Sequence, residues 1–174
     1  RMPRLTPEVK KLRRLMLPVA LGAGVYQINI LVDLVIGSLL PSGTISFLYY
    51  ADRVNQLPLG VVGIAVATAL LPLLARQIRA GNEAEALASQ NRAVEFAMAL
   101  TIPAAFALVA VAQPIIIVLF GRGAFNEAAQ TATGWTLAAY ALGLPAYVLV
   151  KILSTGYFAR EDTKTPVKVA VIAL

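Results

Sequence analysis

A short polar run interrupts one of the long apolar stretches of this sequence. Asp52 and Arg53 stand side by side, and Gln56 follows within one helical turn. Arg53 lies nine residues beyond Thr44, where the stretch begins, which is about 14 Å along a helix. A charge at that depth in a membrane costs at least about 2.5 kcal/mol, so such residues usually face a cavity or a partner.

The chemistry of Arg53 favours anions, because its planar guanidinium matches the oxygens of a phosphate group. Asp52 projects about 100° away from Arg53 on a helix, so we expect each of the two to find its partner across the bundle. Gln56 shares the Arg53 face. The pattern predicts a wet cavity in which Arg53, Asp52 and Gln56 bind substrate. A structural salt bridge between helices is the alternative.

Two isolated charges lie in other apolar stretches. Asp33 can hold a cation, carry a proton, pair with a basic residue such as Arg53, or lie at the interface without a role. It is the candidate for sodium or proton coupling. Lys151 lies about seven residues from the end of its stretch. There it either reaches the headgroups or adds positive charge to the cavity, as a fourth substrate-binding residue.

The residues needed for most enzyme chemistry are missing. The sequence has no cysteine and no histidine, which excludes disulfides, thiolate metal sites and catalysis by either residue type. It has no nucleophile–base pair, metal-ligand spacing or glycine-rich phosphate loop. We therefore expect no enzyme, no metal site and no cofactor. Much of the +6 net charge flanks the first apolar stretch without interleaved aromatics, so a nucleic acid is not expected as a partner.

Membrane-spanning helices must position these residues. Of the 174 residues, 59% are hydrophobic and 14% are charged, against about 25% charged in soluble domains. A bilayer core about 30 Å thick needs roughly 20 helical residues. We expect an all-α, polytopic transmembrane helix bundle, with 1–174 as a single membrane unit. The expected spans are 15–40, 44–75, 92–112, 128–158 and a truncated 165–174, with an interfacial helix at 114–121 after a break at Gln113-Pro114.

Basic residues are distributed unevenly over the loops. If the spans alternate in direction, one side of the membrane carries twelve basic residues and the other carries Arg122 alone. The positive-inside rule then puts the basic side, including the N-terminal flank, in the cytoplasm. The sequence closes in the middle of an apolar run, so we expect it to be a piece of a longer chain.

Three motifs resemble a known family. The run SFLYYADR at 46–53, continued by QLPLGVVGIA at 56–65, resembles the eighth transmembrane helix of the MurJ (MviN) lipid II flippases. The run VKIL at 150–153, followed by YFAREDTKTPV at 157–167, resembles the end of their tenth helix and the start of the eleventh. FGRGAF at 120–125 resembles the segment between helices nine and ten. The resemblance covers nearly the whole chain.

This resemblance implies part of the C-lobe of a multidrug/oligosaccharidyl-lipid/polysaccharide exporter fold, from helix seven to the start of helix eleven. It implies a multi-pass protein of the bacterial inner membrane that moves lipid II, the undecaprenyl-pyrophosphate-linked peptidoglycan precursor, by alternating access. Arg53 falls on the family's cavity arginine and Asp52 on its acidic neighbour. Asp33 falls in the helix where some members place a sodium ligand. The other partners would be membrane lipids and the N-lobe of the same chain, which holds the rest of the site.

Two other functions remain open on the sequence. An exporter of another lipid-linked glycan, or of drugs, in the same superfamily would differ in substrate only. A non-transporting structural bundle predicts that Arg53 is paired with Asp52 or Asp33 and closed off from water.

Overall fold

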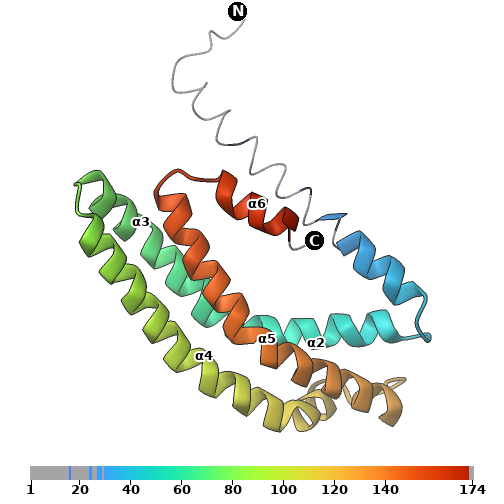
Figure 1. The fold of residues 1–174 in the computed structure, drawn as a ribbon. Helices are drawn as coiled ribbons and strands as arrows, with labels where there is room; N and C mark the ends of the chain where they lie inside the picture. The colour runs from blue at the N-terminus through green and yellow to red at the C-terminus, as the bar shows by residue number, and fades with distance from the viewer. Residues whose placement is uncertain (1–15, 17–23, 25–26, 29, 173–174) are drawn as a thin grey trace, which may run out of the picture.

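The computed structural model describes residues 16, 24, 27–28 and 30–172, and these residues form helices and turns with no strand (Figure 1). Three helical units among them are long and apolar enough to cross a membrane: Thr44–Arg79, Glu83–Phe120 and Glu127–Ala159. The expected all-α membrane bundle is confirmed. The expected span 15–40 lies partly outside the described residues. Its last part, 30–38, is helical and ends in a turn before Thr44.

The first of these units is a continuous helical path with a local change of geometry. It consists of α2 (Thr44–Pro58), a π-helical segment η1 (Leu59–Ile64) and α3 (Ala65–Arg79). Pro58 has no N–H to donate to the carbonyl of Val54, and the wider π-helical turn follows directly. The helix resumes after η1, since unpaired backbone groups are costly in a bilayer.

The second unit, α4 (Glu83–Phe120), runs unbroken through Pro103 and Pro114. The expected break at Gln113-Pro114 is therefore wrong, and so is the separate interfacial helix at 114–121. Residues 114–120 instead form the last turns of α4. Pro114 removes one backbone N–H, whereas ending the helix there would leave several backbone groups unpaired in lipid. Gln113 also ties this region to the next helix, because its Nε2 donates to the Thr131 carbonyl at 3.1 Å.

Capping side chains fix the starts of the last two helices. Asn126 Oδ1 accepts a hydrogen bond from the Ala129 N–H at 2.9 Å and starts α5 (Glu127–Ala159). Asp162 Oδ1 accepts bonds from the N–H groups of Lys164 and Thr165, at 3.0 and 3.1 Å, and starts α6 (Lys164–Ile172). Helix α6 stands where the sequence predicts a fifth span.

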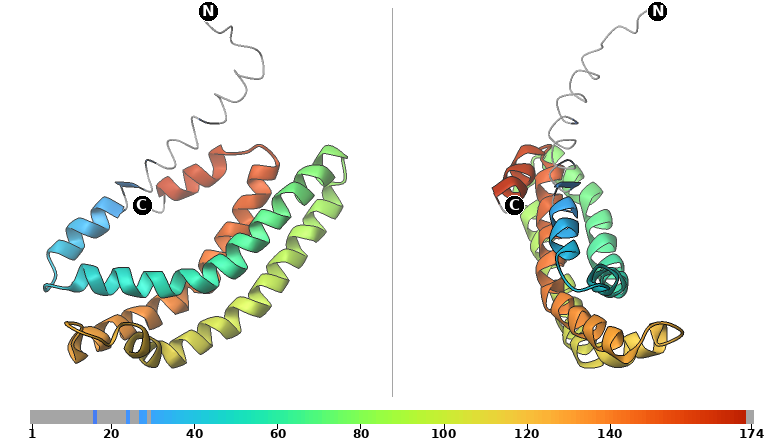
Figure 2. Two further views of the ribbon diagram at one scale, coloured as in Figure 1. Left: turned by 180° about the vertical axis from the view of Figure 1, so that it is seen from behind. Right: turned by 90° about the vertical axis from the view of Figure 1, so that its right-hand side faces the viewer.

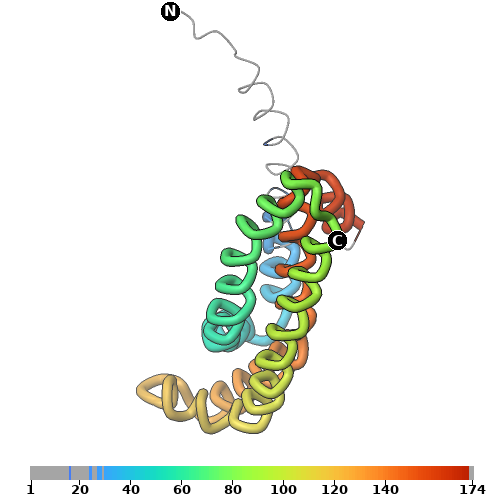
Figure 3. The backbone as a smooth tube through the Cα atoms, turned by 90° about the vertical axis from the view of Figure 1, so that its left-hand side faces the viewer, coloured from blue at the N-terminus to red at the C-terminus, as the bar shows by residue number. Residues whose placement is uncertain are grey.

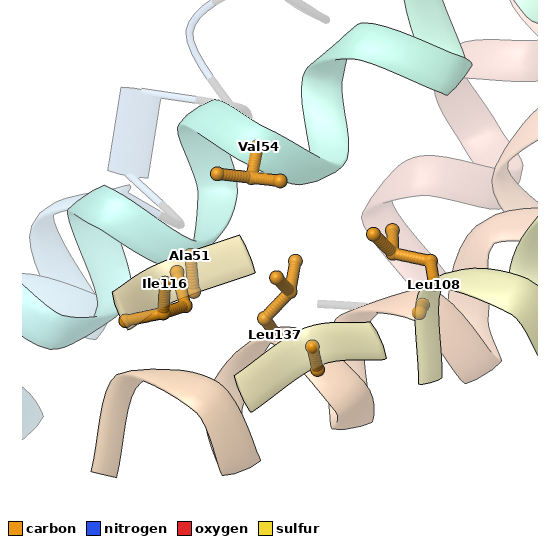
Figure 4. Close-up of a cluster of buried hydrophobic side chains, with 7 residues drawn as sticks. Ala51, Val54, Leu108, Ile116 and Leu137 are labelled. Carbon is orange, nitrogen blue, oxygen red and sulfur yellow. The ribbon is translucent and has the colours of Figure 1, made fainter. Parts of the chain in front are cut away.

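Buried hydrophobic side chains form two separate clusters. The first cluster joins α2 to the second half of α4 and the first half of α5 (Figure 4). Its buried members are Ala51, Val54, Leu108, Ala112, Ile116, Leu137 and Ala141. The second cluster joins α3 to the first half of α4 and the second half of α5. Its buried members are Leu70, Leu74, Ala86, Ala97, Val148 and Ile152.

The three long units lie side by side and bend in the same sense, so the bundle is curved along its length (Figure 2). The tube view shows this curvature from a second side (Figure 3). At one end, Arg160 Nη2 forms an ion pair with Glu83 Oε2 at 2.9 Å, which joins the end of α5 to the start of α4. At the other end, the ring of Tyr50 packs on Phe120 and Phe125. Each end of the bundle thus has its own contact between helices, an ion pair at one end and aromatic packing at the other, in addition to its own hydrophobic cluster.

Candidate functional site

The predicted polar residues lie on α2, which has one buried face and one exposed face. The residues turned into the bundle are Ala51, Val54 and Asn55, which are 0%, 6% and 4% exposed. Arg53 and Gln56 are exposed and Asp52 is half-buried. The packing of α2 against α4 and α5 therefore leaves its polar side free.

Tyr49 holds the guanidinium of Arg53 from one helical turn earlier. The Tyr49 hydroxyl oxygen accepts hydrogen bonds from Arg53 Nε at 3.2 Å and from Arg53 Nη2 at 2.8 Å. The Arg53 Cζ lies 5.1 Å from the centre of the Tyr49 ring, within the range of a cation–π contact. Tyr49 thus engages the side edge of the guanidinium, and the edge formed by Nη1 and Nη2 stays available.

Asp52 has its own partner on the same helix. Gln56 Nε2 donates a hydrogen bond to Asp52 Oδ2, again across one turn. We expected both charged residues to find partners across the bundle, but in the structure the two partners lie on α2. Arg53 forms no ion pair with Asp52, nor with any other acidic residue in the part of the chain that the structure describes.

Tyr49 was not among the site residues predicted from the sequence. A spacing of three positions placed Gln56 on the Arg53 face, whereas the two observed pairs are four positions apart, which is the other neighbour spacing of a helix. A tyrosine four residues before a membrane-embedded arginine is the signal that would have found it.

Tyr50, the neighbour of Tyr49, fixes the start of α2. Its ring centre lies 4.8 Å from that of Phe120 and 5.6 Å from that of Phe125, the latter in an edge-to-face arrangement. Phe120 ends α4, and Phe125 lies in the turn before α5. Tyr50 therefore anchors α2 to the neighbouring helices, while Tyr49 engages Arg53.

The other predicted site residues lie apart from this group. Lys151 is exposed on α5, next to Ile152 of the second cluster. Asp33 is exposed in the helical stretch before α2. Asp33 and Asp52 both lie within electrostatic range of the half-buried Tyr140 hydroxyl on α5. The structure thus places Arg53, Asp52 and Gln56 on one helix, in two separate hydrogen-bonded pairs, and relates Asp33 to them only at longer range.

Comparison with known proteins gives consistent results. The family model of the lipid II flippase MurJ matches residues 1–174. A relative from Rhizobium meliloti, named "Probable lipid II flippase MurJ", is 54% identical over 100% of this chain and 32% of its own length. A relative of the same name from Haemophilus influenzae is 43% identical over 95% of this chain and 34% of its own length.

A solved structure titled "Lipid II flippase MurJ, inward closed conformation" superposes with a TM-score of 0.80 at 32% identity. The match covers 94% of this chain and 35% of that one. This chain spans about a third of the length of the relatives it matches. Because the family model covers every residue, the chain belongs to the lipid II flippase MurJ family.

Proposed function

We propose that this chain forms part of a lipid II flippase and contributes one wall of a membrane cavity that binds the pyrophosphate of the lipid-linked peptidoglycan precursor. Family membership supports the substrate class. The observation that carries the site is the guanidinium of Arg53, which lies within a membrane span, is exposed, and is oriented by Tyr49. A charge placed there without an acidic partner is suited to an anionic ligand.

Binding would use the free edge of the guanidinium. Nη1 and the second hydrogen of Nη2 can donate two parallel bonds to the oxygens of one phosphate. The Tyr49 hydroxyl accepts both bonds from Arg53, so its own proton is free to donate to the second phosphate. Asp52 accepts a hydrogen bond from Gln56 and forms no ion pair with Arg53. Together these groups would recognise a pyrophosphate rather than a single charge.

The rest of the site would come from elsewhere. The chain spans about a third of its relatives, and the opposite wall of the cavity would belong to the N-lobe of the same protein. Movement of the bound headgroup across the bilayer would follow by alternating access. Lys151 would add positive potential, and Asp33 would couple transport to sodium or protons.

The charge at the two ends of the bundle supports an orientation. The described basic residues near the α3–α4 and α5–α6 turns are Arg76, Arg79, Arg92, Arg160, Lys164 and Lys168. The opposite end carries Arg122. By the positive-inside rule, the first end faces the cytoplasm of a bacterial inner membrane, and the segment before the first span lies there too.

A structural bundle is less well supported, because it requires Arg53 to be paired and closed off from water. Among the described residues, Arg53 has no acidic partner. An exporter of another lipid-linked glycan, or of drugs, would share the fold and differ in the headgroup that it binds.

The test uses the full-length protein that carries this sequence. Arg53→Ala should abolish growth of a flippase-depleted strain, and Arg53→Lys should do so largely, because a point charge does not replace a planar fork. Arg79→Ala, an exposed arginine at the end of α3, is the matched control and should support growth. Purified protein should bind undecaprenyl pyrophosphate and lose that binding with Arg53→Ala. Full growth of Arg53→Ala at normal expression would refute the proposal.

A further inference from the structure

The two hydrophobic clusters leave a short stretch of every long helix between them. On the first path this stretch covers residues 55–58, at the end of α2 and directly before η1. On α4 it covers 99–107, and on α5 it covers 142–147. We call these three stretches together the bending interval. Leu59 and Val62 of η1 border the second cluster, and only Ala105 and Leu144 supply buried hydrophobic side chains within the interval.

Each helix is weakened within this interval. Pro58, Pro103 and Pro145 lie inside their helices, and each lacks the N–H that would bond the carbonyl four residues earlier. The carbonyls left without that bond belong to Val54, Ala99 and Ala141. On the first path, the π-helical segment η1 follows the proline, and such segments are frequent at functional sites. All three long helices therefore lose backbone support at one level of the bundle.

Some buried polar side chains of the bending interval also lack hydrogen-bond partners. Among the described residues, three buried side-chain polar atoms lack a hydrogen-bond partner, and two of these are Asn55 Oδ1 and Thr101 Oγ1. Both belong to the bending interval. Buried polar atoms without partners are costly, so this arrangement of the interval is not fully stabilised. A different arrangement has bonds to gain there.

The two glycines of η1 have different surroundings. A Cβ at Gly60 would meet nothing within 4 Å, so the space beside it is open. A Cβ at Gly63 would lie 3.3 Å from Val148 Cγ2, so this glycine lets η1 approach α5 closely. The first path is thus in close contact with α5 at Gly63 and has open space beside Gly60, where tilting meets no neighbour.

We propose that the bending interval is a hinge within the bundle, at which the half held by the first cluster bends relative to the half held by the second. The first half carries Arg53 on α2, and the second carries Lys151 on α5. Bending at the interval changes the distance between these two cations, a consequence that rests on the proposed function. The hinge itself stands on the clusters, the prolines and the unpaired atoms alone.

Hydrogen–deuterium exchange of the unaltered full-length protein in nanodiscs is the first test. Amides of the bending interval should exchange about tenfold faster than those of the flanking cluster segments in the same helices. Equal protection along each helix would overturn the hinge. The measurement needs no substitution, so a folding defect cannot obscure it.

Distances between spin labels give the second test, in a cysteine-free background. The pair Ser46→Cys and Ala80→Cys spans the interval, whereas Ser46→Cys and Ala124→Cys stay within the first half; all three positions are exposed. The spanning pair should give a broad or two-peaked distance distribution and the other pair a narrow one. Equal widths would overturn the proposal.

Proline replacement links the broad distribution to the interval. Pro103→Ala with Pro145→Ala should restore two backbone bonds and narrow the spanning distribution. Pro72→Ala with Pro114→Ala, two helical prolines outside the interval, is the control and should leave it broad. If both double substitutions narrow the distance distribution equally, or if neither narrows it, the hinge does not lie at this level. Loss of undecaprenyl pyrophosphate binding by Arg53→Ala tests the proposed function separately.

Discussion

Tyr49 and Arg53 lie one turn apart on α2, and the hydroxyl oxygen of Tyr49 accepts hydrogen bonds from both Nε and Nη2 of Arg53. One neutral oxygen thus occupies one whole edge of the guanidinium. The contact orients the charge without cancelling it, which an aspartate in the same place would do. This relationship gives Tyr49 a positioning role that can be tested by removing a single atom.

Tyr49→Phe should weaken binding of undecaprenyl pyrophosphate by about fivefold, because Arg53 loses the hydrogen bonds that set its orientation. The fold itself should be unaffected, since the ring remains. The measurements are the dissociation constant and the thermal stability of the purified full-length protein. Tyr157→Phe on α5 is the matched control and should change neither. If Tyr49→Phe binds as tightly as the parent, Arg53 is positioned by something else.

Leu137→Ala should destabilise the protein by about 2 kcal/mol. Leu137 is fully buried in the first cluster, so truncation leaves a cavity between three helices. We expect the low end of the range seen in soluble cores, because lipid is as apolar as leucine and packing alone is lost. Leu142→Ala, at a side chain that is 67% exposed on the same helix, is the control. Equal losses of stability in the two variants would argue against the first cluster as a packed core.

The start of α6 should loosen in acid. Hydrogen bonds from the Thr165 hydroxyl and N–H, with smaller contributions from the Lys164 N–H and Lys168, hold the pKa of Asp162 below its ordinary value of 3.8. A lowered pKa in the folded protein means that the capping contribution is complete above the ordinary value. It is lost as the pH falls through the lowered one. The effect should therefore be absent at neutral pH and appear only below about pH 4.

A spin label at the exposed Val169 reports this change. Its mobility should rise on acidification in the parent protein. In Asp162→Asn the label should respond little to pH over the same range, because no carboxylate remains to be protonated. A label whose mobility rises equally in both proteins would point to another titrating group.

The ion pair between Arg160 and Glu83 should matter little for stability. Their side chains are 37% and 60% exposed, and exposed pairs typically contribute at most about 1 kcal/mol. Glu83→Gln should lower the free energy of unfolding by less than that, with the larger loss at low salt. A loss that does not depend on salt would indicate a packing role instead.

The sequence predicted the all-α membrane bundle correctly and the interruptions of its helices poorly. Long apolar runs indicate burial in lipid, so the membrane bundle could be predicted from them, and the motifs at 46–65, 120–125 and 150–167 indicated the family. The predicted helix break at Pro114 was wrong because proline ends helices in water, where exposed backbone groups bind solvent. In lipid the helix continues past it. The π-helical segment η1 has no sequence signal of its own beyond Pro58 and Gly60.

The sequence places Arg53, Asp52 and Gln56 on one helix but does not give their contacts, and their role in a site stays a prediction. The three residues do share one helix, as their spacing requires. Their hydrogen-bond partners could not be assigned, because helical spacing allows a neighbour at three or at four positions, and side-chain rotamers decide between them. Whether Asp33 and Lys151 belong to the same site stays a prediction. Their relation to Arg53 depends on tertiary packing rather than on spacing.

The aromatic contacts of Tyr50 have a consequence for how Arg53 can move. The rings of Tyr50, Phe120 and Phe125 pack on one another, so rotation of α2 about its own axis would break the contacts of Tyr50 with the other two rings. The direction in which the Arg53 side chain projects from α2 is therefore set relative to the ends of α4 and α5. Movement of the Arg53 charge would therefore carry the ends of α4 and α5 with it, as one rigid unit.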